Sequence, residues 1–376
     1  MPDLLSELCI FFNELADNRI QPAMGFPVDA AHRLAQYYLI LRDKKEENFV
    51  GLEIAFREFI SEFGLPLPIN FLDLLREAEL ITSPRDLRKE KQRDHYVHTL
   101  HAFSLGVYLF HRAERLQDML LPENRSLDWS QWAFCALLHD IGYIAENAGT
   151  KQIIVLNRFW DLIFQPTSIL SFVSNNSDVP PSIELELSHF RKDVYGRLSQ
   201  NFGLVRATDK SAGTDLFEEY VSIPIDTFEG GDHGVKSHFI LQLCQCICEE
   251  FMVYFENHEG NVRDYLYPRT NPWHRFSNAM QAIQAHCKPA NLIHGHYMLN
   301  PWINALHLVD ELQDYNRPFL SPSYRTNTAR PLRIDDIDIS VANSILYFHY
   351  PSSNAVRIND ALGTITTDSG ICVQAK

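Results

Sequence analysis

The sequence predicts a mainly α-helical protein with a small β-rich region at its C-terminal end. Glycine accounts for 16 of the 376 residues, about 4% against a usual ~7%, and turn signals typical of β-hairpins are few. Long stretches instead repeat apolar residues at helical spacing. After Pro318 the pattern changes, because Ile337, Ile339 and Val341 alternate with polar residues as in a strand.

Amphipathic patterns predict a helical N-terminal region that comprises residues 1–84. Apolar spacing and start signals predict its helices over residues 4–15, 27–42, 48–63 and 71–80. A basic segment follows, in which Arg85, Arg88, Lys89, Lys91 and Arg93 outnumber two acidic residues. Such a segment is typical of a solvated helix start, or of a patch that faces phosphate groups.

Residues 85–318 form the main helical domain in this interpretation. Its expected helices cover residues 94–121, 129–143, 273–287 and 301–315. Another expected helix is rich in cysteine and begins at residues 230–234. Residues 151–230 are less regular, with one helix expected over 183–202, and predict an insertion. Residues 319–376 predict the small β-rich region, in which 345–350 is one strand and 355–365 pairs with it.

The cysteines predict reduced thiols in the cytoplasm. Their number is seven, which is odd, and the first residues lack the basic start of a secretory leader. Cys244, Cys246 and Cys248 lie in an apolar helical stretch, which favours core packing over metal binding. Glu249 and Glu250 interrupt that stretch, so it predicts no membrane span.

The overall charge favours a small ligand over a long nucleic acid. Lysine and arginine number 33 against 48 aspartates and glutamates, which gives a net charge of −15. Binding along a nucleic acid requires a basic face. A small anion held by a local cluster or by metal ions remains compatible with this charge.

Histidine and aspartate residues interrupt helices that are otherwise apolar. His98 lies on a buried stripe, His139 and Asp140 end the apolar run 133–138, and Asp310 lies in the apolar helix 301–315. Burying such groups is costly unless they are paired or bind metal. Helices that converge with imidazoles and carboxylates can form a metal site. Mixed nitrogen and oxygen ligands suit Mn, Fe, Co, Ni or Zn, and Mg less well.

Several neighbours remain alternatives or supporting residues. His95 and His101 lie on faces close to that of His98, and Asp314 lies one turn beyond Asp310. A ligating histidine usually donates its other N–H to a carboxylate or carbonyl. By sequence neighbourhood, the carboxylates expected in that role are Asp94, Asp232 and Glu311.

Three motifs in order resemble the HD-domain metal-dependent phosphohydrolases, a family named after its His-Asp doublet. They are Arg93-Asp-His-Tyr-Val-His98, Ala136-Leu-Leu-His139-Asp140-Ile-Gly and Leu308-Val-Asp310-Glu-Leu-Gln. The resemblance covers residues 85–318 and implies an HD-type helical bundle. It assigns metal ligation to His98, His139, Asp140 and Asp310.

Two further segments resemble second-metal elements of binuclear members. Asp232-His233 begins one helix and His286 ends another, so the resemblance adds His233 and His286 as ligands. It implies one or two divalent ions, with Asp140 in the bridging position and catalytic roles for Asp140 and His233. Positive groups would then offset phosphate charge. The candidates are Arg85, Arg88, Lys89, Arg93, Lys236 and Arg317.

The resemblance implies a hydrolase that acts on a small nucleotide. The signatures of the deoxynucleoside triphosphohydrolases and of the cyclic dinucleotide phosphodiesterases are absent, since the doublet continues as Ile141-Gly-Tyr143. A nucleoside triphosphate, an alarmone, and a cyclic or oligonucleotide messenger all remain candidate substrates. The settings that the resemblance implies are nucleotide homeostasis, bacterial signalling or antiphage defence. The alternative function is a nucleotide-binding sensor or scaffold without turnover. Long helical insertions of this kind often mediate homo-oligomers.

Overall fold

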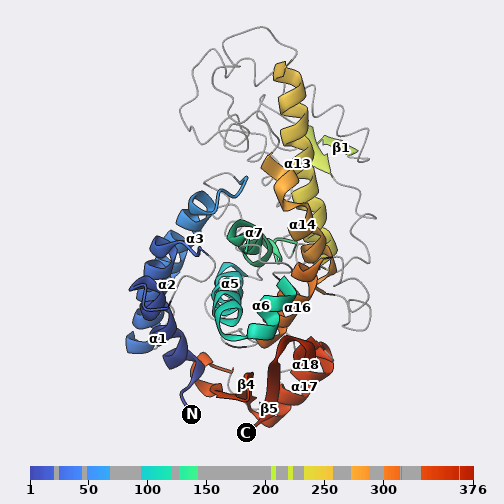
Figure 1. The fold of residues 1–376 in the computed structure, drawn as a ribbon. Coiled ribbons are helices and arrows are strands. Elements are labelled where there is room, and N and C mark those ends of the chain that lie inside the picture. Colours follow the sequence, from blue (N-terminus) through green and yellow to red (C-terminus); the bar gives the residue numbers. More distant parts are fainter. Residues whose placement is uncertain are drawn as a thin grey trace. The chain divides into compact units, whose positions relative to one another are not determined.

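A computed structural model of the chain confirms a mainly helical protein with a three-stranded sheet near its C-terminal end (Figure 1). It describes residues 1–20, 25–44, 49–67, 95–120, 127–142, 205–208, 219–222, 233–256, 272–287, 300–313, 315, 332–363 and 365–376. The chain divides into two compact units. The first contains residues 1–65, 90–139 and 281–376, and the second contains residues 66–89 and 140–280.

Three N-terminal helices begin the first unit, close to their predicted bounds. They are α1 (Leu4–Ala16), α2 (Val28–Lys44) and α3 (Phe49–Glu62). The Asp3 carboxylate caps α1, accepting from the Ser6 amide at 2.8 Å. The rings of Phe12 on α1 and Tyr38 on α2 stack with centroids 5.5 Å apart, which joins these two helices through their apolar faces. The helix expected over residues 71–80 lies outside the described residues.

The helix expected over residues 94–121 is two helices, which corrects the prediction. They are α5 (His95–Arg112) and α6 (Glu114–Leu120), separated at Ala113. Near the break, Nδ1 of His111 donates to the Val107 carbonyl at 2.7 Å. Burial lowers the pKa of the His111 imidazole, so a neutral ring is favoured there.

Helix α7 (Trp129–Leu138) packs closely on α5. Asp128 caps its start, accepting from the amides of Ser130 and Gln131. The indole N–H of Trp132 donates to the Phe103 carbonyl at 3.0 Å. A Cβ on Gly106 would lie 2.0 Å from a ring carbon of Trp132, so this approach of the two helices requires glycine.

Helix α7 ends earlier than expected, because residues 139–142 form a turn rather than a continuation to Tyr143. The Ala136 carbonyl accepts from Nδ1 of His139 at 2.9 Å. Within the second unit, the Gly142 amide donates to Oγ of Ser237 at 2.7 Å. The chain therefore leaves the helix axis directly at the His-Asp doublet.

The C-terminal sheet has the order β3-β4-β5. Strands β3 (Asp338–Ala342) and β4 (Ile345–Tyr350) lie where strands were expected, and they are antiparallel, with Ile339 paired to Phe348. Strand β5 (Ile371–Ala375) runs parallel to β4 and was not expected. The start of the chain adds to β3, since the Ile339 amide donates to the Pro2 carbonyl at 2.9 Å.

Residues 355–365 were expected to pair with β4, and this prediction is wrong. They belong to α17 (Ser352–Leu362) and to α18 (Ile365–Ser369), which connect β4 to β5. Ala355, Ile358 and Leu362 are buried at spacings of three and four residues. That spacing is helical. A parallel pair also requires such a crossover connection.

Helix α16 (Pro301–Leu312) lies between the central helices and this C-terminal region in the first unit. Asn300 caps it, accepting from the Trp302 amide at 3.2 Å, and Pro301 occupies the favourable first helical position. The Tyr350 hydroxyl donates to the Leu312 carbonyl at 2.5 Å. Arg357 of α17 contacts Glu311 at 2.9 Å. The sheet and α17 thus hold the last turn of α16.

The second unit contains α13 (His233–Glu256), η3 (Pro272–Phe276) and the first residues of α14 (Ser277–Ala285). A two-stranded antiparallel pair, β1 (Val205–Thr208) and β2 (Glu219–Ser222), lies in the expected insertion and was not predicted. Cys244 and Cys248 are fully buried in α13, in agreement with core packing. Burial raises the pKa of the Cys248 thiol to about 12.

Two further findings concern the expected elements. The helix predicted over residues 273–287 is η3 followed by α14, and His286 and Cys287 lie in a turn beyond it. The helix predicted over 183–202 lies outside the described residues. Among those that are described, no helix is both long and apolar enough to cross a membrane.

We expect Gly106→Ala to lower the free energy of unfolding by about 2 kcal/mol, because the new methyl group overlaps the Trp132 ring. Denaturant unfolding measures this loss. In a Trp132→Phe background, which removes the ring atoms that the methyl group meets, the same change is expected to cost much less. Equal costs in both backgrounds would contradict the close approach of α5 and α7.

We expect Ser344→Gly to raise the free energy of unfolding by about 1 kcal/mol. Asn343 and Ser344 connect β3 to β4 with φ of 54° and 60°, which is a left-handed conformation that costs a serine about 1–2 kcal/mol. The matched control is Ser353→Gly in the first turn of α17, where glycine is expected to destabilise the helix. A loss of stability in Ser344→Gly would contradict the assigned turn.

Candidate metal centre

Side chains from four segments of the first unit converge on one buried place. His98 lies on α5, His139 directly follows α7, His286 directly follows α14, and Asp310 lies in the last turn of α16. His139 is fully buried, and His286 and His98 are 1% and 8% exposed. The three imidazoles are therefore shielded from water, and the Asp310 side chain beside them is 16% exposed.

The contacts among these groups are short. Nε2 of His98 lies 2.9 Å from Oδ1 of Asp310 and 3.2 Å from Nε2 of His139. Nε2 of His139 lies 3.5 Å from the same carboxylate oxygen. One nitrogen or oxygen from each of His139, His286 and Asp310 lies within 4.8 Å of the other two. These separations are close enough for one ion to bind all three.

The backbone sets the orientation of two of the rings. Nδ1 of His139 contacts the Ala136 carbonyl at 2.9 Å, and Nδ1 of His286 contacts the Ile283 carbonyl at 2.6 Å. A carbonyl only accepts, so each Nδ1 carries the hydrogen and each Nε2 carries a lone pair. Histidines that bind metal have this arrangement, in which the second nitrogen donates to a carbonyl or carboxylate.

The donor set suits a divalent cation. A lone pair on His139 and the Asp310 carboxylate face each other at 3.5 Å in a buried place, where neighbouring negative charge is poorly screened. A cation attracts both groups, and mixed imidazole and carboxylate donors are typical of transition-metal sites. Buried histidine and aspartate residues of this protein could therefore hold a metal ion.

His307 supports the turn that carries His286. Nδ1 of His307 contacts the His286 carbonyl at 2.7 Å, and its Nε2 contacts the Ala361 carbonyl at 3.2 Å. His307 lies on α16 and Ala361 on α17. The position of His286 thus depends on the same C-terminal elements that hold α16.

Asp140 and His233 lie in the second unit and contact each other there. Oδ1 of Asp140 lies 3.4 Å from Nε2 of His233, and Asp140 is 5% exposed. A Cβ on Gly142 would meet the His233 carbonyl at 2.1 Å, so the turn after His139 packs tightly on the start of α13. Lys236 lies one turn after His233 and is buried.

Of the six sequence-predicted ligands, His98, His139, His286 and Asp310 come together in the first unit. Asp140 is peptide-bonded to His139, and it pairs with His233 in the second unit. Among the predicted phosphate-binding residues only Lys236 is described. Those outside the described residues are Arg85, Arg88, Lys89, Arg93 and Arg317.

The alternatives to these ligands have other partners or are not described. Nε2 of His101 contacts the Tyr37 hydroxyl at 2.7 Å, on the side of α2. Glu311, expected to support a ligand histidine, contacts Arg357 instead. The side chain of His95 and the residues Asp94, Asp232 and Asp314 lie outside the described part.

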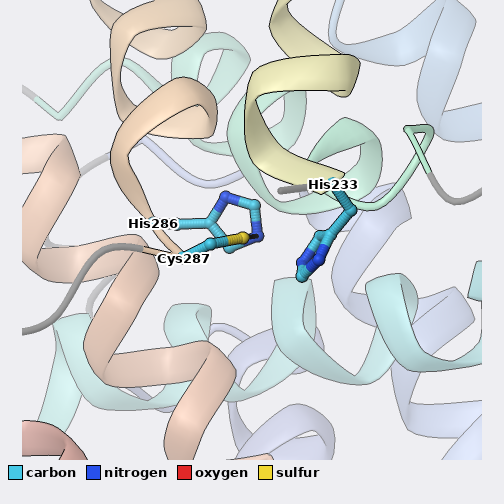
Figure 2. A group of neighbouring side chains, drawn as sticks. All are labelled: His233, His286 and Cys287. Carbon is cyan, nitrogen blue, oxygen red and sulfur yellow. Dashed lines mark hydrogen bonds between the residues drawn. The ribbon is translucent and has the colours of Figure 1, made fainter. Parts of the chain in front are cut away.

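One residue near the centre was missed by the sequence analysis. Sγ of Cys287 lies 3.2 Å from Nε2 of His286, and Figure 2 shows its side chain beside that ring. Figure 2 also draws His233, which belongs to the second unit. A cysteine next to a candidate histidine ligand at a helix end was the signal in the sequence.

Comparisons of the chain with protein families, with curated proteins and with solved structures find no match. The chemistry of the centre is therefore inferred from the residues themselves.

We expect the purified protein to bind zinc or cobalt, and Asp310→Asn to weaken this binding about tenfold or more. Asparagine keeps the size of the side chain but removes its charge. Isothermal titration measures the dissociation constant. Acidification below about pH 6 is expected to release the ion, since ligating histidines must be neutral.

His274→Ala is the control for this experiment, because His274 is an exposed histidine of η3. It is expected to leave the dissociation constant unchanged. Equal affinities of the wild type and Asp310→Asn would contradict a centre that includes Asp310.

Proposed function

We propose that this protein is a divalent-metal-dependent phosphohydrolase of the HD type that acts on a small nucleotide. The observation that carries the proposal is the convergence of His98, His139 and Asp310, with contacts of 2.9, 3.2 and 3.5 Å in a buried place. Their order along the chain is also that of the motifs that resemble the HD family. A bound divalent ion supplies Lewis acidity toward phosphoryl oxygens and lowers the pKa of water.

Different residues would bind the metal ion and the substrate. His98, His139, His286 and Asp310 would hold an ion, and the family resemblance would give Asp140 a ligand role as well. Asp140 contacts His233 at 3.4 Å. This contact supports the predicted roles of Asp140 and His233 in ion binding and catalysis. Lys236 would bind a phosphate that is not transferred, since it lies one turn after His233 and carries a positive charge.

The net charge of −15 supports a small nucleotide over a long nucleic acid. An acidic chain repels an extended phosphate backbone, whereas a single nucleotide needs only a local positive site. A nucleoside triphosphate, a deoxynucleoside triphosphate, an alarmone, and a cyclic or oligonucleotide messenger share this requirement. Hydrolysis of a phosphoester or phosphoanhydride bond in one of these is the proposed reaction.

The proposal is tested with chelated protein reloaded with Mn, Fe, Co, Ni, Zn or Mg. We expect at least one nucleotide in a panel of dNTPs, NTPs, alarmones and cyclic dinucleotides to be hydrolysed only after reloading. Asp140→Ala is expected to lower the rate about a hundredfold or more. Chromatography of the products and phosphate release measure the reaction.

Variants and controls separate the outcomes. His274→Ala is expected to keep full activity, because its side chain is exposed. If the wild type binds two equivalents of metal and His286→Ala loses activity while it retains one equivalent, the result would support two ions. Stoichiometric metal and tight nucleotide binding without turnover would contradict the enzyme and favour a sensor or scaffold.

A further inference from the structure

The thiol of Cys287 lies next to the imidazole of His286, a candidate metal ligand. Its Sγ is 3.2 Å from Nε2 of His286, which is the ring nitrogen that does not contact the Ile283 carbonyl. Nε2 is thus the ring nitrogen that carries the lone pair. The thiol therefore lies on the metal-binding side of the ring, as Figure 2 shows.

The end of α14 explains how two adjacent side chains converge. Successive residues inside a helix point about 100° apart, but α14 ends at Ala285, and His286 and Cys287 form the following turn. The His286 amide still donates to the Ala282 carbonyl at 3.0 Å. The helix therefore fixes the histidine, while the turn brings the next side chain back toward its ring.

The sulfur–nitrogen distance agrees with two ligands of one ion. Zinc–sulfur bonds of about 2.3 Å and zinc–nitrogen bonds of about 2.0–2.1 Å place neighbouring donors about 3.1–3.6 Å apart. The observed 3.2 Å lies in that range. His286 also shares a group with His139 and Asp310 whose ligand atoms lie within 4.8 Å of one another, so the thiol adjoins an imidazole that belongs to the candidate centre.

We infer that Cys287 is a thiolate ligand of the metal centre and that it directs the centre toward zinc, cobalt or iron. The inference rests on the proposed metal centre. As the sulfur–metal bond forms, the thiol proton passes to solvent, and no oxidant or reductant is needed. Thiolates favour softer ions, whereas a set of only imidazoles and carboxylates also accepts manganese and magnesium.

Cobalt reports on this ligand directly, because thiolate–cobalt(II) pairs absorb in the near ultraviolet by charge transfer. The full-length protein loaded with one equivalent of cobalt(II) is expected to show this band. Cys287→Ser is expected to lose the band, to bind cobalt about tenfold or more weakly and to bind manganese with little change. Cobalt-edge X-ray absorption of the wild type is expected to show a sulfur neighbour at about 2.3 Å.

Cys372→Ser is the matched control, because Cys372 is another half-buried thiol, on β5. It is expected to keep both the band and the affinity. Cobalt bound stoichiometrically without a sulfur neighbour would overturn the thiolate ligand and leave the proposed function intact. Failure of the wild type to bind cobalt, zinc or manganese would overturn both.

Discussion

The close approach of α5 and α7 is the constraint on which the candidate centre depends. The Trp132 ring lies against Gly106 and its indole N–H bonds to Phe103. His98 lies eight residues before Gly106, and His139 lies seven residues after Trp132, which is about 12 Å and 10 Å along the two helices. Because both steps are about two turns, one contact aligns the two histidines at 3.2 Å.

The C-terminal region has a structural role in the same centre. The sheet binds the end of α16 through Tyr350, and α17 binds it through Arg357. The Ala361 carbonyl of α17 contacts His307 in the middle of α16. Asp310 lies in the last turn of α16, and His307 of the same helix contacts the backbone of His286. The C-terminal region, which the sequence predicts only as a small β-rich addition, therefore positions the candidate ligands Asp310 and His286.

The sequence predicted the elements with strong periodicity and the order of the site residues. It placed α1, α2 and α3 to within about two residues, and it selected His98, His139 and Asp310 because polar groups in apolar helices require partners. The family resemblance added His286. Sequence-based prediction failed where a tertiary contact decides the structure. The end of α7, for example, depends on contacts of the turn after it.

The spacing of apolar residues also led to a wrong prediction in the C-terminal region, for a physical reason. Residues 355–365 contain apolar residues that suit either a short strand or a helix. The parallel pairing of β4 with β5 requires a crossover, and only knowledge of that pairing selects the helix. Cys287 was missed for a similar reason, since adjacent residues share a site only where a helix has already ended.

Charge at the centre links the two proposals. For the donors of the first unit alone, one divalent ion bound by neutral imidazoles and the Asp310 carboxylate has a net charge of +1, and a Cys287 thiolate would reduce it to zero. A neutral centre attracts a phosphate less strongly than a positive one. Substrate binding would then depend more on positive side chains of the chain than on the ion. A thiolate ligand would therefore make such side chains more important for offsetting phosphate charge.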